Sequence, residues 1–205
     1  MANLITIARF PLLLIIVLLL YADSVGARFA ATFLVPLLIF MDTLDGMIAR
    51  RRHEVSLLGS VLDIMADRSV ELVLWVCYAH LGLIPIAIPL IVILRGTIVD
   101  SLRSIHVREG EAPFHAMRTR LGSWLVSSPW MRSSYGISKL LAFTGLGAAH
   151  AVTLLAEAGQ ASMQVARGLT LAFNIMSWVA VAFCLVRGLP VIIEALPLLR
   201  KGQAS

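Results

Sequence analysis

Charged residues are scarce in this chain of 205 residues: Asp, Glu, Lys and Arg make up 14% of it, whereas soluble domains have about 25%. Hydrophobic residues make up 59%, and the mean hydropathy is +0.89. One buried core cannot hold so many apolar side chains, so the excess needs lipid around it. The composition excludes an ordinary soluble domain and predicts an integral membrane protein.

Cysteine is scarce as well, which excludes two kinds of site. The two cysteines, Cys77 and Cys184, both lie in apolar runs and form no CxxC pair, so neither a disulfide framework nor a thiolate metal site is expected. The five histidines show neither HxH nor HxxxH spacing, which argues against zinc. Strips of aromatic and basic residues are also absent, so the net charge of +5 is not assigned to nucleic-acid binding.

Six apolar segments have about the length that one bilayer crossing needs. Each is expected to be a helix, because a helix satisfies its own backbone hydrogen bonds in lipid. We therefore predict an all-α integral membrane protein with six transmembrane helices in one bundle, forming a single domain over residues 1–205. Arg9 alone is basic ahead of the first apolar run, so we expect a retained helix and not a signal peptide. The segments are Ile5–Tyr21, Phe29–Ala49, Leu58–Leu81, Ile84–Ile105, Tyr135–Leu155 and Gly168–Val186. The last can continue, with a bend at Pro190, toward Leu199.

Basic residues gather in the connections on one side of these segments. They are Arg50, Arg51, Arg52, Arg103, Arg108, Arg118, Arg120, Arg132, Arg187, Arg200 and Lys201. Only Arg28 and Arg167 stand on the other side. The positive-inside rule then predicts that both termini lie in the cytoplasm. We further expect a multi-pass protein of the inner (cytoplasmic) membrane. In the longest connection, residues 106–134, apolar residues at helical spacing predict a short interfacial helix, with an ordinary solvated loop as the alternative.

Four aspartates stand where the chain is otherwise most apolar. Asp42 and Asp45 are three residues apart, and Asp63 and Asp67 are four apart, so each pair occupies one face of a helix. A short connection makes the two helices an antiparallel hairpin, whose acidic faces can meet at the cytoplasmic boundary. Four carboxylates so close raise one another's pKa unless a cation offsets them. Their hard oxygens suit Mg²⁺, Mn²⁺ or Ca²⁺.

Small residues beside these acids favour a bound nucleotide. Gly46 and Gly59 remove a side chain on each helix, where a ligand can approach the backbone. Ala49 is small, and Arg50 adds a cation near the expected phosphates. Together these residues predict a metal–pyrophosphate site with room for a flat base. The alternative is that the acids only form ion pairs with nearby arginines, namely Arg50, Arg51, Arg52 and Arg68.

The spacing from Asp42 to Asp67 fits the pattern D-x2-D-G-x2-A-R-x8-G-x3-D-x3-D at each of its positions. The chain thus resembles the CDP-alcohol phosphatidyltransferase family. The resemblance implies a membrane enzyme, commonly a homodimer, that uses an alcohol to displace CMP from CDP-diacylglycerol. It implies that Asp42, Asp45 and Asp63 hold one or two Mg²⁺ or Mn²⁺ ions. It also implies that Asp67 is the general base and can contact the metal.

The acceptor alcohol is a separate question. The opening residues, with Asn3 and Arg9, resemble those of bacterial phosphatidylglycerophosphate synthases, and Asn3 is assigned to the nucleotide site. That resemblance implies glycerol 3-phosphate as the acceptor. The G-K-x-K-T stretch of those enzymes is only partly kept at residues 136–140, so inositol 1-phosphate or an uncharged alcohol stays open. The candidate residues for the acceptor phosphate are Arg95, Arg103, Arg118 and Lys139.

Two other classes of function remain as alternatives. A divalent-cation transporter would need acids near the middle of the bilayer and a path to both faces, whereas these acids stand at one end of their helices. A non-catalytic membrane scaffold would leave the spacing of the acids unexplained. The sequence therefore favours the phosphatidyltransferase.

Overall fold

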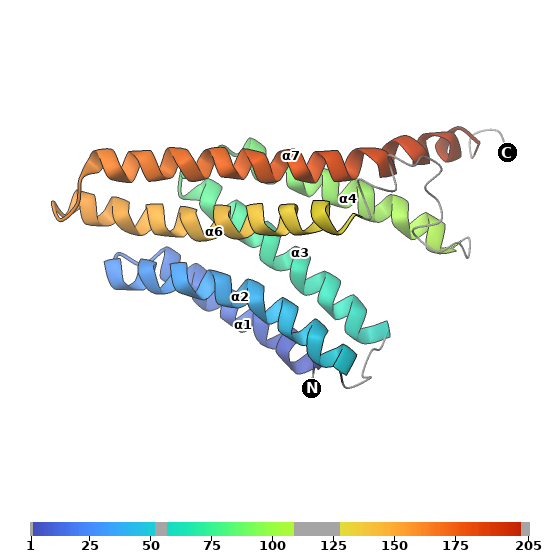
Figure 1. Cartoon of the computed structure of the whole chain (residues 1–205), viewed down its shortest axis with the longest axis horizontal. Coiled ribbons are helices and arrows are strands. Elements are labelled where there is room, and N and C mark those ends of the chain that lie inside the picture. Colours follow the sequence, from blue (N-terminus) through green and yellow to red (C-terminus); the bar gives the residue numbers. More distant parts are fainter. Residues whose placement is uncertain (1, 52–56, 109–127, 202–205) are drawn as a thin grey trace. The chain divides into compact units, whose positions relative to one another are not determined.

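The computed structural model describes residues 2–51, 57–108 and 128–201, and every regular element in these ranges is a helix (Figure 1). The all-α prediction is confirmed for the described residues. The six helices in these ranges are α1 (Ala2–Leu20), α2 (Val25–Arg51), α3 (Leu57–His80), α4 (Ala87–Arg108), α6 (Pro129–Glu157) and α7 (Met163–Lys201).

Three of the described helices are long and apolar enough to cross a membrane. The spans are Val25–Leu44 in α2, Pro129–Glu157 in α6 and Met163–Ile193 in α7. A shorter apolar stretch, Leu4–Leu20, forms most of α1. Acidic and basic residues interrupt α3 and α4. The helices therefore support a membrane protein. Of the six predicted spans, three correspond to described helices that qualify as membrane spans.

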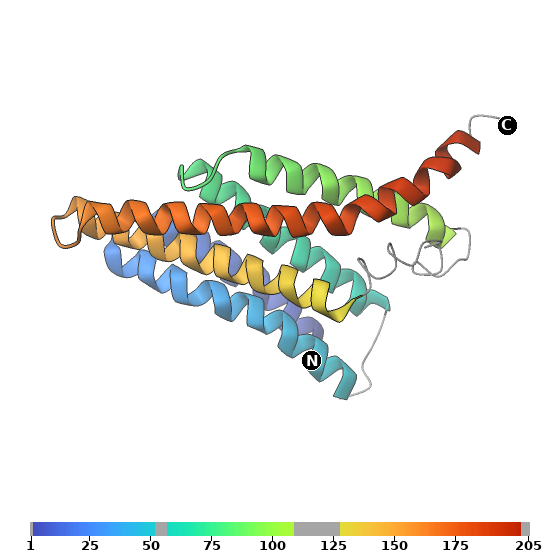
Figure 2. The ribbon, with the colours of Figure 1, turned by 45° about the horizontal axis from the view of Figure 1, so that its top comes forward.

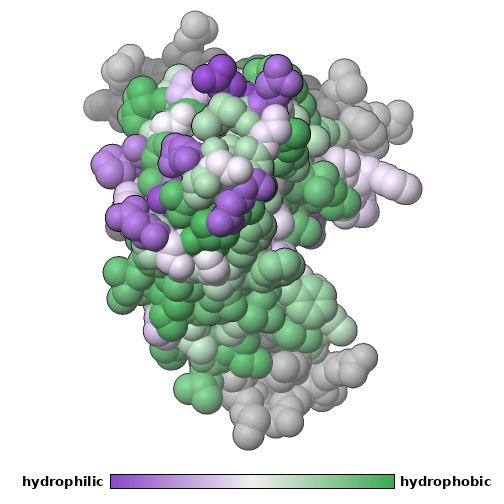
Figure 3. Space-filling model, turned by 90° about the vertical axis from the view of Figure 1, so that its left-hand side faces the viewer, coloured by the Kyte–Doolittle hydropathy of each residue, from purple (hydrophilic) through white to green (hydrophobic). Residues whose placement is uncertain are grey.

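Large apolar side chains are exposed on the surface of these helices. Leu4 is 72% exposed, Phe33 73% and Trp130 81%. In the view of Figure 3, hydrophobic residues cover most of the coloured surface, and hydrophilic residues are confined to separate groups. Such extensive apolar surface is unfavourable in water and matches a lipid environment.

Two helix ends are set by glycines in the left-handed conformation. After α3, Gly82 has a φ of 72°; its N–H bonds to the carbonyl of Ala79, and the next N–H bonds to the carbonyl of Tyr78. Gly159 has the same φ after α6; its N–H bonds to the carbonyl of Ala156, and the N–H of Gln160 bonds to the carbonyl of Leu155. Glycine accepts this conformation without a Cβ clash, so each helix ends sharply and the chain turns.

The ends of α6 and α7 differ from the predicted segments. Helix α6 begins at Pro129, well before Tyr135, because proline fits the first position of a helix, where its missing N–H is not needed. Helix α7 continues past Val186 and through Pro190 to Lys201. Figure 2 shows that its C-terminal part changes direction, as expected where a proline removes a backbone donor. The predicted interfacial helix at 106–134 falls mostly outside the described residues.

The chain forms two compact units, and the first contains residues 1–86 and 140–176. In this unit α1 packs against both α2 and α3. The rings of Trp75 and Phe143 lie 4.5 Å apart between centroids, and the buried hydroxyl of Tyr78 donates a 2.7 Å hydrogen bond to the carbonyl of Phe143. His150 Nε2 lies 3.1 Å from the carbonyl oxygen of Leu20. These contacts join α6 to α3 and to the end of α1.

The second unit contains residues 87–139 and 177–205, with α4 and the adjoining parts of α6 and α7. Val99 and Val191 are its buried apolar pair, with Leu102 and Ile192 packed against them. Gly188 lets a charged side chain approach α7 closely, because a Cβ at this position would lie 2.5 Å from Nε of Arg95.

Candidate functional site

Three of the four aspartates are described with their side chains, and all three belong to the first unit. Asp42 lies in the C-terminal half of α2. Asp63 and Asp67 lie in the first half of α3, one helical turn apart and hence on one face. Asp45 is also in α2, but its side chain is outside the described set. The structure therefore brings acids from two helices into one region.

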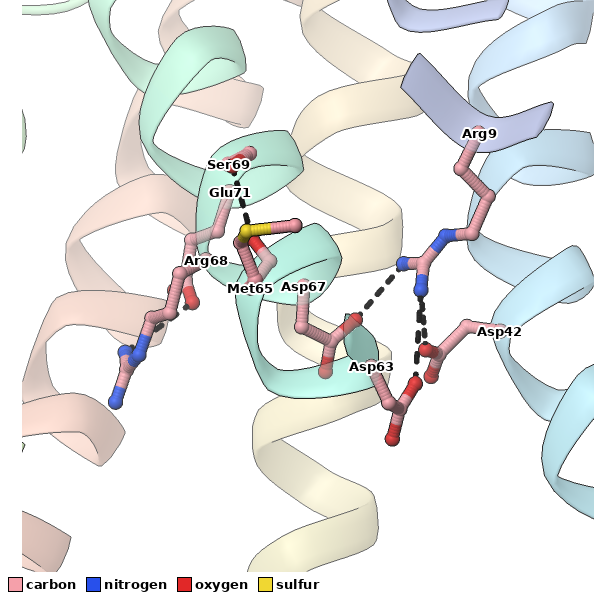
Figure 4. Close-up of polar contacts among 8 residues, drawn as sticks. All are labelled: Arg9, Asp42, Asp63, Met65, Asp67, Arg68, Ser69 and Glu71. Carbon is pink, nitrogen blue, oxygen red and sulfur yellow. Dashed lines mark hydrogen bonds and ion pairs between the residues drawn. The ribbon is translucent and has the colours of Figure 1, made fainter. Parts of the chain in front are cut away.

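The side chain that gathers these acids is Arg9 of α1 (Figure 4). Its Nη1 donates a 2.6 Å hydrogen bond to Oδ1 of Asp42. The same nitrogen lies 3.8 Å from Oδ1 of Asp63. Its Nη2 donates a 2.8 Å bond to Oδ1 of Asp67. One guanidinium thus contacts carboxylates from both α2 and α3.

Burial differs sharply between the arginine and its partners. The side chain of Arg9 is 2% exposed, whereas those of Asp42, Asp63 and Asp67 are 32%, 51% and 56% exposed. A buried guanidinium is stable only when its charge is paired, and these carboxylates supply that pairing. With all four groups ionised, three acids outnumber one cation. The cluster is therefore negative and open to water on the side of the aspartates.

Sequence reasoning did not assign Arg9 to the site. It was noted as the basic residue ahead of an apolar run and as part of the opening that resembles bacterial phosphatidylglycerophosphate synthases. A usable signal was present, because a charged residue inside a membrane helix generally faces a partner or a polar cavity. The ion-pair alternative named Arg50, Arg51, Arg52 and Arg68, whereas the described partner of Asp42, Asp63 and Asp67 is Arg9. Arg68 instead lies 3.7 Å from Glu71, one turn further along α3.

For the other predicted residues of the acidic site, the structure gives the helix in which each one lies. Gly46 in α2 and Gly59 in α3 are partly exposed helical residues, one on each of the helices that carry the acids. Asn3 lies in the first turn of α1. Ala49 and Arg50 lie near the end of α2. The side chains of Asn3, Ala49 and Arg50 are outside the described set.

The chemistry of the donors fits a hard divalent cation. Carboxylate oxygens of Asp42, Asp63 and Asp67 already converge on one positively charged group at 2.6 to 3.8 Å, and oxygen ligands of this type suit Mg²⁺ and Mn²⁺. Within the described ranges, no three His, Cys, Asp or Glu side chains are spaced as ready metal ligands. A metal would therefore have to share these oxygens with the guanidinium or rearrange them.

A separate basic group lies in the second unit. Lys139 Nζ lies 4.5 Å from the centroid of the Tyr135 ring, and Arg187 Cζ lies 5.6 Å from the same centroid. Arg187 was not among the predicted acceptor residues, because it was interpreted only as a basic residue that follows the last span. Arg95 is partly buried in α4, and its Nε has no hydrogen-bond partner among the described residues. Cations held on one aromatic ring can receive an anion such as phosphate.

Two further acceptor candidates lie outside the described side chains. Arg103 lies in α4 but its side chain is outside the described set, and Arg118 falls in the undescribed connection. Lys139 and Arg95 are the predicted acceptor residues whose side chains are described.

Comparison with known proteins identifies the family. No curated protein matches the chain. A family model described as CDP-alcohol phosphatidyltransferase matches residues 1–186, which include α1 to α4, α6 and most of α7. The match covers the helices that carry the aspartates and the arginine between them. The chain therefore belongs to the CDP-alcohol phosphatidyltransferase family.

Proposed function

We propose that this enzyme transfers the phosphatidyl group of CDP-diacylglycerol to glycerol 3-phosphate and releases CMP. Membership of the family makes the chain a CDP-alcohol phosphatidyltransferase of the membrane and excludes the transporter and scaffold alternatives as its primary role. The observation that carries the proposal is the convergence of Asp42, Asp63 and Asp67 from two helices, with an open, negatively charged side. Such a cluster suits a cation-bound diphosphate.

In this proposal Asp42, Asp45 and Asp63 would hold one or two Mg²⁺ or Mn²⁺ ions. When bound, the metal neutralises the negative charge that builds up on the leaving CMP. The aspartates bring their charge from α2 and α3, so the packing of these helices sets the distance between the ligands. The small residues Gly46 and Gly59 leave space beside them for the nucleotide. Asn3, Ala49 and Arg50 complete the proposed nucleotide site.

Asp67 is the proposed general base. The acceptor hydroxyl attacks the phosphorus that carries the diacylglycerol, a new P–O bond forms, and the bond to the CMP oxygen breaks. The hydroxyl proton passes to the carboxylate of Asp67. Two features of this side chain support the role: Arg9 holds one oxygen, Oδ1, at 2.8 Å, and the side chain is 56% exposed. The carboxylate is thus both oriented and reachable by an acceptor.

The basic group of the second unit is the proposed acceptor site. Glycerol 3-phosphate carries a phosphate, and Lys139 supplies a cation that the Tyr135 ring holds in place. Arg187 supports this role through the same ring. Arg95, Arg103 and Arg118 are the further candidates. An acceptor without phosphate would not need this concentration of positive charge.

We further propose that α1, α3 and α4 also cross the membrane, giving six spans with both termini and the acids in the cytoplasm. These helices have 19, 24 and 22 residues, and about 20 residues suffice to cross the hydrocarbon core. Charged residues in α3 and α4 are tolerable in such spans when they face the site or one another. The proposed assembly is a homodimer in the inner membrane.

A direct assay tests the reaction and its acceptor together. Purified protein in detergent is incubated with CDP-diacylglycerol, Mn²⁺ or Mg²⁺ and one of four acceptors: glycerol 3-phosphate, inositol 1-phosphate, inositol or serine. The lipid product is identified by mass, and CMP is measured in parallel. Phosphatidylglycerophosphate from the first acceptor is the expected product. Turnover of serine or inositol with neither sugar phosphate would overturn the acceptor, and no CMP with any acceptor would overturn the role of the acids.

A further inference from the structure

We propose that Arg9 is a positioning residue that holds the acids in register and weakens their affinity for a divalent cation until substrate arrives. This inference rests on the proposed function of the aspartates as metal ligands and base. It goes beyond that function because it assigns a role to a side chain of α1, which contributes no acid.

The position of Arg9 on α1 is the first argument. Thr6, Arg9, Leu13, Ile16 and Leu20 are all buried, with exposed fractions from 0 to 6%. They recur at intervals of three or four residues and therefore form one stripe of the helix. Arg9 occupies a core position on that stripe, the face that is packed away from solvent. A long charged side chain at such a position is costly unless its pairing serves a purpose.

The second argument is the way in which the guanidinium divides its contacts. Nη1 contacts Asp42 of α2, and Nη2 contacts Asp67 of α3 (Figure 4). The two nitrogens belong to one rigid planar group, so their separation is fixed. Arg9 therefore sets the distance between a proposed metal ligand and the proposed base. A lysine ammonium is a single point charge and cannot fix that distance in the same way.

The third argument is electrostatic. Arg9 and a bound divalent cation would contact the same carboxylate oxygens, and their positive charges would repel each other. For a unit charge and a divalent ion about 6 Å apart in a water-like dielectric, the repulsion corresponds to about a tenfold change in affinity. The acids alone would bind the cation more tightly than the acids with Arg9. The diphosphate of the substrate brings the negative charge that offsets this repulsion, so metal and nucleotide binding become coupled.

The experiment measures Mn²⁺ binding and turnover separately. Binding of Mn²⁺ without nucleotide is followed by electron paramagnetic resonance for the wild type, Arg9→Gln, Arg9→Lys and the control Arg28→Gln. Arg28 is a matched arginine of the first unit whose ion-pair partner, Asp23, is 99% exposed. CMP release is then measured at saturating Mn²⁺. Elution as a single species and the unfolding temperature in detergent establish that each variant is folded.

Opposite changes in the two readouts are the expected signature. Arg9→Gln binds Mn²⁺ about tenfold more tightly, yet its kcat falls about a hundredfold because Asp67 is no longer held in place. Arg9→Lys keeps the affinity for Mn²⁺ close to that of the wild type and loses turnover. Lysine retains the positive charge of arginine but lacks the planar group whose two nitrogens contact both acids. Arg28→Gln leaves both quantities unchanged. A merely structural role would weaken binding and turnover together.

Other outcomes bear on the role of Arg9 as follows. If Arg9→Gln binds Mn²⁺ with wild-type or weaker affinity, the inference is wrong. If Arg9→Gln does not fold, Arg9→Lys decides: wild-type kcat overturns the positioning role, and a lowered kcat with unchanged Mn²⁺ affinity supports it. If the wild type itself binds no Mn²⁺ and releases no CMP, the proposed function has failed, which is a different result from failure of the role of Arg9.

Discussion

The substitution Asp67→Asn separates the chemistry of the site from its stability. Asparagine keeps an oxygen in the place of Oδ1, so it can still accept the 2.8 Å hydrogen bond from Arg9 Nη2. The buried guanidinium also retains Asp42 as a charged partner at 2.6 Å. Because Asp67 is 56% exposed, the lost attraction is screened by water, and we expect a loss of stability of less than about 1 kcal/mol.

The expected loss of activity is much larger. An amide cannot take the proton of the acceptor hydroxyl at neutral pH, and loss of a general base typically costs about 10²- to 10⁴-fold in rate. The assay is the initial rate of CMP release from CDP-diacylglycerol with glycerol 3-phosphate, with unfolding temperature measured on the same preparation. Asp23→Asn is the control, because Asp23 is 99% exposed and pairs with Arg28, outside the acidic cluster. A rate within threefold of the wild type (a factor small beside the loss expected for a missing base) would refute the role of Asp67.

Three further predictions concern packing, the acceptor and the metal. A Cβ at position 145 would collide with the ring of Phe173, whereas one at Gly168 meets no atom within 4 Å; Gly145→Ala should therefore destabilise the protein by about 1 to 3 kcal/mol in thermal unfolding, and equal stability of Gly145→Ala and Gly168→Ala would contradict the packing of α6 against α7. Lys139→Gln and Arg187→Gln should each raise the KM for glycerol 3-phosphate about tenfold or more with a smaller change in the KM for CDP-diacylglycerol; an unchanged acceptor KM would remove this group from the proposed site. Removal of divalent ions with EDTA should abolish CMP release, and Mn²⁺ or Mg²⁺ should restore it; full activity in EDTA would exclude the metal role of the aspartates.

Much of the class and chemistry of this protein follows from local sequence patterns. The low content of charge and the long apolar runs predict membrane helices, because lipid leaves a spanning chain few other ways to satisfy its backbone. The spacings of three and four residues between Asp42 and Asp67 predict acids on one face of each helix whatever the rest of the chain does, and the resemblance of the whole pattern to the CDP-alcohol phosphatidyltransferase family implies the reaction. The family match over residues 1–186 agrees with both.

Some features were harder to predict for reasons that are also local. Helix α6 begins at Pro129, which the preference of proline for the first helical position could have indicated. Helix α7 continues through Pro190 to Lys201, as the expected extension toward Leu199 indicated, because tertiary packing and lipid can compensate for one missing donor. The number of spans depends on how charged residues of α3 and α4 are shielded, which hydropathy does not measure.

The composition of the acidic cluster was decided by tertiary structure. Arg9 is 33 residues from Asp42 and 58 from Asp67 along the chain. The helical repeat relates only residues on neighbouring turns, so it cannot link Arg9 to these acids. The motif from Asp42 to Asp67 includes no residue of α1. Only the packing of α1 against α2 and α3 turns the buried stripe that carries Arg9 toward both acids. The sequence alone predicted the carboxylates that we propose for the reaction, and the fold decided which cation contacts them, because a contact between distant helices depends on how their faces pack.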